Sequence, residues 1–298
     1  MKKISLLVLV PFLIVMGAYA EKIPHWITSA DNKNAANSWL CFQKVYTLKS
    51  VPRSALARIA VDSKYWLWIN GKPVVLEGAV KRGPNPQDTY YDRVEIAPYL
   101  KRGDNLISVL VWHYGKKGFS HNPSGVAALF FDCNAKDAPL VSDGSWTARL
   151  HPAYFTPGQP DPNYRLPESN LGFDARKDIR GWEQTMNTDW QKASELGCEG
   201  DAPWNKLHFR IIPQWKDFGL KDYVKEEVHT GKECDTLVCR LPYNAQVMPY
   251  VRLEAEEGQT VRMVTDNYFG GGEPNVRAEY VTVAGVQEYE NKGWMNGE

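Results

Sequence analysis

The stretch Tyr65-Trp-Leu-Trp-Ile69, Asn70-Gly71 and Lys72-Pro-Val-Val-Leu76 decides the fold class. Asn-Gly between two apolar runs is the strongest local signal for a β-hairpin, because both turn positions need a positive φ. Trp66 and Trp68 are two positions apart, so they share one face of the first strand, and the alternate residues take the other face. One face could serve as a sugar platform, but large aromatic side chains more often fill a core.

Short apolar runs on either side of this hairpin extend the β pattern. In chain order they are Arg58-Ile-Ala-Val-Asp62, Arg93-Val-Glu-Ile96, Leu106-Ile-Ser-Val-Leu-Val-Trp112 and Val126-Ala-Ala-Leu-Phe-Phe131. The run at 106–112 is apolar enough to be a central strand. Strands this short, separated by turns this often, indicate β-sandwiches rather than βαβ units.

The pattern predicts two antiparallel β-sandwich domains. A charged stretch around residues 215–228 is followed by new strand signals at 236–241, 251–255, 260–264 and 279–283. We therefore expect a galactose-binding-like or jelly-roll sandwich over residues 21–222 and a second sandwich over residues 223–298. The chain stops after Gly293-Trp-Met-Asn-Gly-Glu298 without a closing element. We therefore expect the second domain to be truncated, since an edge strand left there would expose unpaired backbone.

One short helix is predicted at residues 188–197. Thr188 caps it, Gln191 follows three positions later as in a capping box, and Gly197 ends it. Its buried face would consist of Trp190, Ala193 and Leu196. The Pro-rich stretch from Pro152 to Pro167 is interpreted as a surface loop within the first domain.

Length and composition are those of a globular protein. The chain has 298 residues, 43% of them hydrophobic and 23% charged, which argues against disorder, collagen and coiled coil. Lys+Arg and Asp+Glu both number 35, so the sequence has no basic footprint for nucleic acid.

Residues 1–20 have the pattern of a secretory signal peptide. Lys2-Lys3 precede an apolar core at 4–15, and Ala18-Tyr-Ala20 is a small-x-small cleavage site. Cleavage after Ala20 would yield a secreted or periplasmic bacterial protein. The apolar run is short for a membrane span, and no second run approaches that length, so we expect no membrane span in the mature chain.

The sequence nominates no catalytic residue and no metal ligand. Gly-x-Ser-x-Gly is absent, and the spacing of Asp and Glu selects no pair. Five cysteines, Cys41, Cys133, Cys198, Cys234 and Cys239, show no metal-type pairing with His and are interpreted as buried, inert thiols. No cofactor is expected; sandwiches of this type sometimes hold Ca²⁺, but no acidic loop is dense enough to name its ligands.

The candidate carbohydrate-binding residues are Trp112, His113 and Tyr114. They stand at a strand end before the loop Lys116-Lys-Gly-Phe-Ser-His121, and loops at strand ends commonly carry binding groups. Burial in the core is the competing interpretation, and the sequence leaves both open.

Several segments resemble known glycoside hydrolases. Ser38-Trp-Leu-Cys-Phe-Gln-Lys-Val-Tyr46 is similar to the entry strand of the sugar-binding-like sandwich found in many of them. More specific segments resemble the N-terminal β-sandwich region of bacterial α-L-rhamnosidases: Phe173-Asp-Ala-Arg176, Gly181-Trp182, Asp189-Trp190, His208-Phe-Arg-Ile-Ile-Pro213, Arg277-Ala-Glu-Tyr-Val-Thr282, Gly285-Val-Gln-Glu-Tyr-Glu290 and Gly293-Trp-Met-Asn-Gly297.

The resemblance implies a secreted enzyme that removes terminal α-L-rhamnose from glycans with inversion. In that family an acid protonates the leaving oxygen and a carboxylate activates water, and both belong to an (α/α) barrel that follows the sandwiches. The chain ends before such a barrel, so we expect it to be inactive alone. Two alternatives stay open: a stand-alone carbohydrate-binding module for rhamnose-containing glycans, or a structural spacer with an exposed apolar patch where the barrel docks.

Overall fold

The computed structural model describes residues 22–80, 83–135, 138–269 and 272–297. The predicted signal peptide at residues 1–20 lies outside the described residues. The helical elements with described bounds are two 3-10 turns, η1 (Ala97–Tyr99) and η2 (Ala175–Lys177). The all-β prediction is confirmed.

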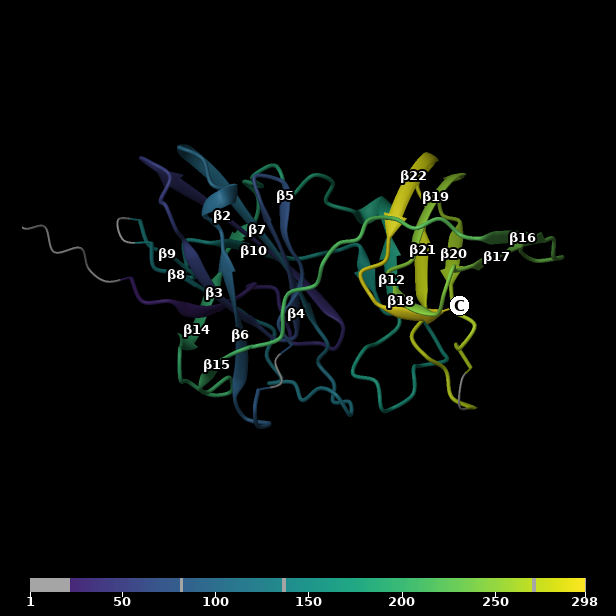
Figure 1. The fold of residues 1–298 in the computed structure, drawn as a ribbon, viewed down its shortest axis with the longest axis horizontal. Coiled ribbons are helices and arrows are strands. Elements are labelled where there is room, and N and C mark those ends of the chain that lie inside the picture. Colours follow the sequence, from purple (N-terminus) through teal and green to yellow (C-terminus); the bar gives the residue numbers. More distant parts are fainter. Residues whose placement is uncertain (1–21, 81–82, 136–137, 270–271, 298) are drawn as a thin grey trace, which may run out of the picture.

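The larger part of the molecule, here called the first lobe, is a sandwich of two sheets (Figure 1). One sheet has the strand order β14-β1-β8-β3-β6-β15, with β9 also paired to β8. Its strands are β1 (His25–Thr28), β3 (Leu56–Val61), β6 (Thr89–Glu95), β8 (Leu129–Cys133), β9 (Leu140–Val141), β14 (Ser194–Cys198) and β15 (Leu207–Phe209). Neighbouring strands are antiparallel except β15 and β6, which run parallel.

The other sheet of the first lobe has the order β13-β10-β2-β7-β4-β5. Its strands are β2 (Ser38–Leu48), β4 (Lys64–Ile69), β5 (Lys72–Gly78), β7 (Gly103–His113), β10 (Thr147–Leu150) and β13 (Gln191–Lys192). The predicted central strand is confirmed, because β7 lies between β2 and β4. The predicted hairpin is confirmed as well: Asn70 and Gly71 join β4 to β5 with φ of 53° and 76°.

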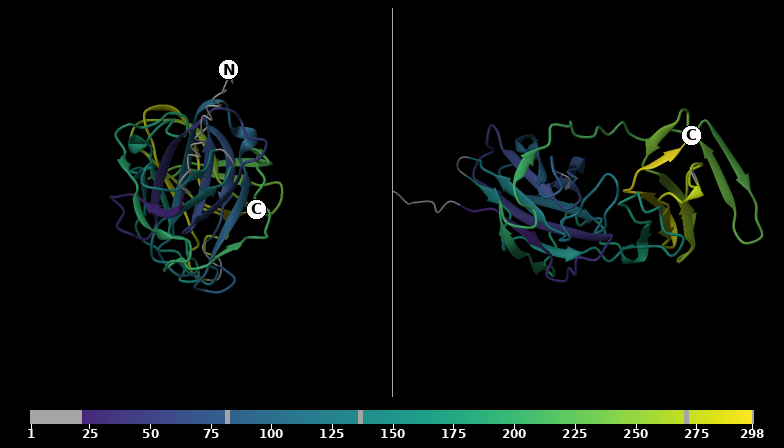
Figure 2. Two further views of the ribbon diagram at one scale, coloured as in Figure 1. Left: turned by 90° about the vertical axis from the view of Figure 1, so that its left-hand side faces the viewer. Right: turned by 90° about the horizontal axis from the view of Figure 1, so that it is seen from below.

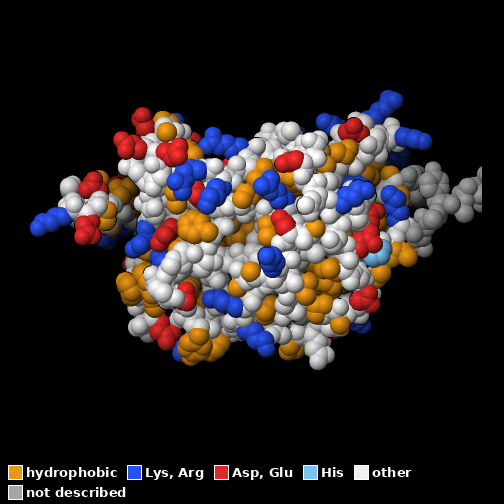
Figure 3. Space-filling view, turned by 180° about the vertical axis from the view of Figure 1, so that it is seen from behind, with side chains coloured by type: hydrophobic (Ala, Val, Ile, Leu, Met, Phe, Trp, Pro, Cys, Tyr) orange, Lys and Arg blue, Asp and Glu red, His pale blue; other side chains and the backbone are white. Residues whose placement is uncertain are grey.

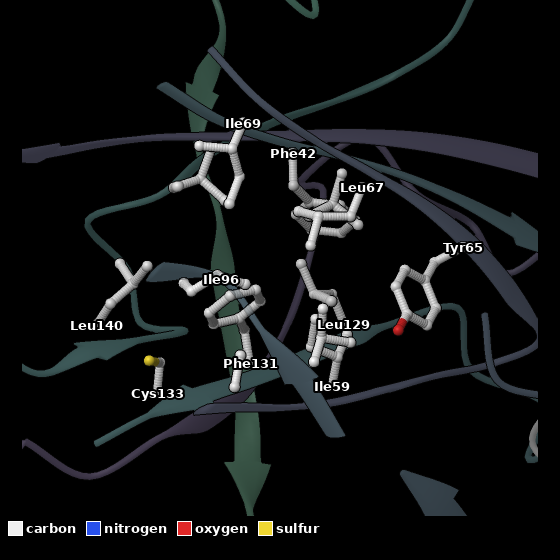
Figure 4. Close-up of a cluster of buried hydrophobic side chains, with 14 of the residues drawn as sticks. Phe42, Ile59, Tyr65, Leu67, Ile69, Ile96, Leu129, Phe131, Cys133 and Leu140 are labelled. Carbon is white, nitrogen blue, oxygen red and sulfur yellow. The ribbon is translucent and has the colours of Figure 1, made fainter. Parts of the chain in front are cut away.

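The main core fills the space between these sheets (Figure 4). Phe42 and Leu67 point inward from one sheet, and Ile59, Leu129 and Phe131 point toward them from the other. On the outer face of β4, Trp66 and Trp68 belong to a second, tryptophan-rich cluster that the rest of the chain covers. The predicted division of this strand into two faces is therefore confirmed, and both faces are used for packing.

The second lobe consists of small sheets around an aromatic core that includes Tyr280 and Tyr289. β11 (Tyr154–Phe155), β12 (Leu171–Asp174), β21 (Ala278–Val281) and β20 (Thr260–Met263) form its largest sheet, in which β12 and β21 run parallel. Three strand pairs complete it: β16 (Lys225–His229) with β17 (Thr236–Arg240), β18 (Ala245–Val247) with β23 (Met295–Gly297), and β19 (Tyr250–Ala255) with β22 (Gly285–Glu290). All four predicted strand signals beyond residue 222 coincide with strands.

Two segments cross between the lobes. The stretch around β11 and β12, which lies before residue 222, supplies strands to the sheet of the second lobe, so the Pro-rich stretch leads across rather than closing within the first lobe. Residues 210–224, here called the strap, return from β15 to the second lobe along the outside (Figure 2). The predicted division at residue 222 stays a prediction.

The predicted helix at residues 188–197 is wrong. Gln191–Lys192 is β13, paired with β10, and Ser194–Cys198 is β14, paired with β1. Trp190 and Ala193 are buried as expected, but in two different clusters, and Leu196 is exposed. Strands far away in the sequence supply hydrogen-bond partners for the backbone N–H and C=O groups of this segment. This long-range pairing overrides the local helix signal.

Candidate functional site

The predicted carbohydrate-binding residues lie in the interior. Trp112, His113 and Tyr114 are 0%, 0% and 1% exposed. The Trp112 indole stacks on that of Trp39, with ring centroids 4.7 Å apart, and Tyr114 meets Trp112 edge-on. The surrounding packing closes all three side chains off from a ligand outside the protein. Sugar binding by this triplet stays a prediction.

Asn37 fixes the positions of two buried indole rings by hydrogen bonds. Its Oδ1 accepts hydrogen bonds from Nε1 of Trp39 at 3.2 Å and Nε1 of Trp112 at 2.9 Å. Its amide nitrogen donates to Thr156 and to the carbonyl oxygen of Asn170. One buried side chain thereby satisfies two indole donors of the first lobe and reaches the segment that crosses to the second.

A buried polar network lies beside the triplet. The carboxylate of Asp62 accepts hydrogen bonds from Ser63 Oγ at 2.8 Å and from the backbone N–H of Ser124 at 2.5 Å. His113 Nδ1 and His121 Nε2 each lie 3.6 Å from Asp62 Oδ1. Burial by itself raises the pKa of Asp62, but hydrogen bonds and charge interactions with the two histidines hold this pKa well below its ordinary value.

The network is not a catalytic triad. Ser63 Oγ lies 3.0 Å from His121 Nε2, and Asp62 Oδ1 approaches that same ring nitrogen. A Ser-His-Asp triad needs the carboxylate on the opposite nitrogen, where it orients the ring and stabilises its positive charge. Sequence reasoning missed this cluster, since Ser63 and His121 are 58 positions apart and only the fold brings them together.

A surface hollow of about 210 Å³ adjoins His121. Residues 83–86 line one side of it, and Lys117, Gly118, Phe119 and Asn122 line the other. We call it the loop hollow. The Nδ1 atom of His121 is buried and has no hydrogen-bond partner in the part of the chain that the structure describes. The loop after β7, suspected from the sequence, therefore does border a concave surface.

An exposed aromatic pair stands next to the loop hollow. Phe119 and Tyr164 are 70% and 67% exposed, and their rings meet edge to face with centroids 5.9 Å apart. The Arg165 guanidinium lies over both rings, 5.7 Å and 5.6 Å from their centroids. The sequence did not single out Tyr164, because it lies in the Pro-rich stretch that only tertiary packing brings to this loop.

Other candidate chemistry is sparse. Across residues 22–297, apart from the undescribed gaps, no group of three or more His, Cys, Asp or Glu side chains is arranged to hold a metal ion. The same residues contain no helix long and apolar enough to cross a membrane.

The cysteines are free thiols. Cys41 and Cys133 are buried as expected, whereas Cys234 is exposed, which corrects the expectation of five buried thiols.

Comparison with solved structures identifies the fold. The α-L-rhamnosidase from Dictyoglomus thermophilum matches 92% of this chain with a TM-score of 0.67 and 19% sequence identity. The chain shares its fold with part of several α-L-rhamnosidases. The enzyme from Aspergillus terreus matches 90% of the chain with a TM-score of 0.64 and 20% identity. A family 78 rhamnosidase of Bacillus sp. GL1 matches 85% with a TM-score of 0.56 and 24% identity.

The match covers only part of these proteins. The chain spans 33%, 32% and 24% of the Dictyoglomus, Aspergillus and Bacillus chains. At such low identity the likeness concerns the fold alone. No family model matches the sequence, and no curated protein matches it.

Proposed function

We propose that this chain is the non-catalytic, N-terminal accessory part of a secreted α-L-rhamnosidase-like glycoside hydrolase. In this proposal an (α/α) barrel outside the chain hydrolyses terminal α-L-rhamnose with inversion. The observation that carries the proposal is the fold likeness over 85–92% of this chain but only 24–33% of the rhamnosidase chains. The predicted signal peptide supports secretion.

Exposed apolar side chains support an accessory role. Nine of them lie on the strap and the β16–β17 hairpin: Ile211, Ile212, Trp215, Phe218, Leu220, Val224, Val228, Leu237 and Val238. Ile211 is 84% exposed and Phe218 is 78% exposed. The hairpin projects from the edge of the molecule (Figure 3). Apolar surface of this kind marks an interaction site, and a docked catalytic domain would cover it.

The coding sequence beyond codon 298 tests this proposal. We expect an open frame that encodes pairs of amphipathic helices, with apolar residues at helical spacing. A stop codon directly after codon 298 would contradict the proposal and favour a stand-alone module.

A carbohydrate-binding module is the second candidate function, and the loop hollow favours it. Phe119 and Tyr164 offer exposed aromatic faces beside a concave polar surface, which is a common arrangement for holding a sugar ring. Calorimetric titration with rhamnosylated oligosaccharides tests it. We expect Phe119→Ala to weaken binding about fivefold or more.

The matched control is Phe269→Ala. Phe269 is 69% exposed and also meets a tyrosine ring, but it does not line the loop hollow. Equal losses in both variants, or no binding by the unaltered chain, would count against this second function.

A further inference from the structure

A second, larger hollow lies in the second lobe. Its volume is about 420 Å³, which falls in the range of small-molecule sites, whereas the loop hollow is half that size. Phe173 of β12 lines one side together with Asp178 and Arg180, and Tyr280 of β21 and Glu288 of β22 line the other. We call it the lobe hollow. It shares no residue with the loop hollow or the buried triplet.

The walls of the lobe hollow are aromatic and fixed. The rings of Phe173 and Tyr280 are nearly parallel, 12° apart in orientation, and Tyr280 stacks on Tyr289 with centroids 4.5 Å apart. The Tyr280 hydroxyl donates to Gln287 Oε1, and the Gln287 amide in turn donates to the carbonyl oxygens of Val283 and Gly285. These bonds hold the β21–β22 turn in one shape without a ligand, which lowers the ordering cost of binding.

Two oppositely charged side chains, Asp178 and Arg180, line the lobe hollow. Among the described residues the Arg180 guanidinium forms no hydrogen bond or ion pair, although its charge lowers the pKa of Asp178. Burial is the larger influence on Asp178 and raises its pKa overall. The lining therefore carries Arg180, Asp178 and a second acid, Glu288, which pairs with Arg252 at 3.6 Å.

His151 does not neutralise Asp178. Its Nε2 lies 3.6 Å from Asp178 Oδ1, beyond a good hydrogen bond. Burial and the charge of Arg149 lower the pKa of His151 to about 4, so the imidazole is neutral at pH 7. Its Nδ1 accepts from the backbone N–H of Ala153, which leaves the ring proton on Nε2, facing the carboxylate.

The charge pattern selects a neutral, hydroxylated ligand. Because Glu288 already pairs with Arg252, the charges of Asp178 and Arg180 balance, and neither an anion nor a cation is favoured. A carboxylate accepts hydrogen bonds from hydroxyl groups, and a guanidinium donates to hydroxyl or ring oxygens. The half-buried ring of Phe173 provides apolar surface for the C–H face of a sugar ring. We propose that the lobe hollow binds one neutral sugar ring, with Asp178 accepting and Arg180 donating.

Saturation-transfer NMR and calorimetry on the full chain test this site. The probes are L-rhamnose, D-galactose and the anionic sugar D-glucuronate. We expect a neutral sugar to bind, and Asp178→Asn and Arg180→Met each to weaken it by about tenfold or more, because each removes a charge-assisted hydrogen bond. Asp189→Asn is the matched control, since Asp189 is an exposed carboxylate that does not line the hollow. It should bind like the unaltered chain.

Three results would overturn the proposal: no neutral sugar binds, D-glucuronate binds more tightly than both neutral sugars, or Asp178→Asn and Arg180→Met bind with unchanged affinity. Binding that is lost in Phe119→Ala but kept in Asp178→Asn would assign the sugar to the loop hollow instead. None of these results depends on whether a catalytic barrel follows, so the site and the accessory role can fail separately.

Discussion

The indole ring of Trp39 lies parallel to the phenol ring of Tyr154, with centroids 3.9 Å apart and planes 7° apart. Trp39 belongs to β2 of the first lobe, and Tyr154 belongs to β11, whose partner β12 pairs with β21 of the second lobe. This contact therefore connects the outer face of the sandwich to the sheet of the second lobe. The tryptophan-rich face of the first lobe serves as a joint between the lobes.

Replacing Trp39 by Ala should destabilise the protein strongly. The side chain is 2% exposed and stacks on three aromatic rings, and the loss of a buried Trp costs about 3–5 kcal/mol. Urea unfolding followed by tryptophan fluorescence measures the change. Trp215→Ala is the control: Trp215 is half-exposed on the strap, so its replacement should cost less than about 1 kcal/mol. Similar costs in the two variants would argue against the joint.

Replacing Asn37 by Gly isolates the hydrogen bonds at this joint. Asn37 has a φ of 58°, which Gly adopts without strain, so the variant loses the side chain and keeps the backbone. Two buried indole N–H groups then lack their acceptor, and we expect a loss of at least about 2 kcal/mol. Asn34→Gly has the same backbone requirement at an exposed site and should change the free energy of unfolding by less. If Asn37→Gly lowers the free energy of unfolding no more than Asn34→Gly does, the hydrogen bonds of Asn37 do not stabilise the joint.

His151 should make the protein sensitive to mild acid. Its pKa is about 4 in the folded chain against an ordinary 6.5, because burial disfavours the charged form. As the pH falls from 6.5 toward 4, the unfolded chain binds a proton that the folded chain does not. The free energy of unfolding should therefore fall by up to about 3 kcal/mol across this window.

The matching measurement is denaturant unfolding at about pH 7, 5.5 and 4.5, three values that span this window. In His151→Gln the free energy of unfolding should fall less steeply with decreasing pH than in the unaltered chain. His229→Gln, at an exposed position on β16, should leave the decline unchanged. An equally steep decline in His151→Gln would refute the role of this residue.

The cysteines should differ sharply in reactivity. Burial raises the pKa of Cys133 to about 12 and that of Cys41 well above its ordinary value, so neither forms the reactive thiolate near pH 8. Cys234 is exposed. A thiol reagent such as Ellman's reagent should show a rapid phase that Cys234→Ser removes and Cys133→Ser leaves intact. A rapid phase that survives Cys234→Ser would contradict this order.

Local sequence signals were sufficient where the structure is decided locally. Asn70-Gly71 needs only its own φ values to set the β4–β5 turn, and the alternation around Trp66 reports two packed faces directly. The apolar run at 106–112 identified a central strand because both of its faces are covered.

Sequence signals failed where distant segments decide the outcome. Residues 188–197 have helical spacing, but the open edges at β10 and β1 bind them as strands. Asp62 and His121 meet only through the fold, and so do Phe119 and Tyr164. The sequence left open whether Trp112 packs in the interior or binds a sugar; the structure places its side chain in the interior, and sugar binding there stays a prediction.

The central proposal is that this chain is the non-catalytic accessory part of a glycoside hydrolase and does not itself break glycosidic bonds. Its most direct test is the release of p-nitrophenol from p-nitrophenyl α-L-rhamnoside by the purified chain, with an active α-L-rhamnosidase as positive control. The account predicts no release above the buffer blank at any concentration of the purified chain. Release that rises in proportion to the concentration of the purified chain would contradict it.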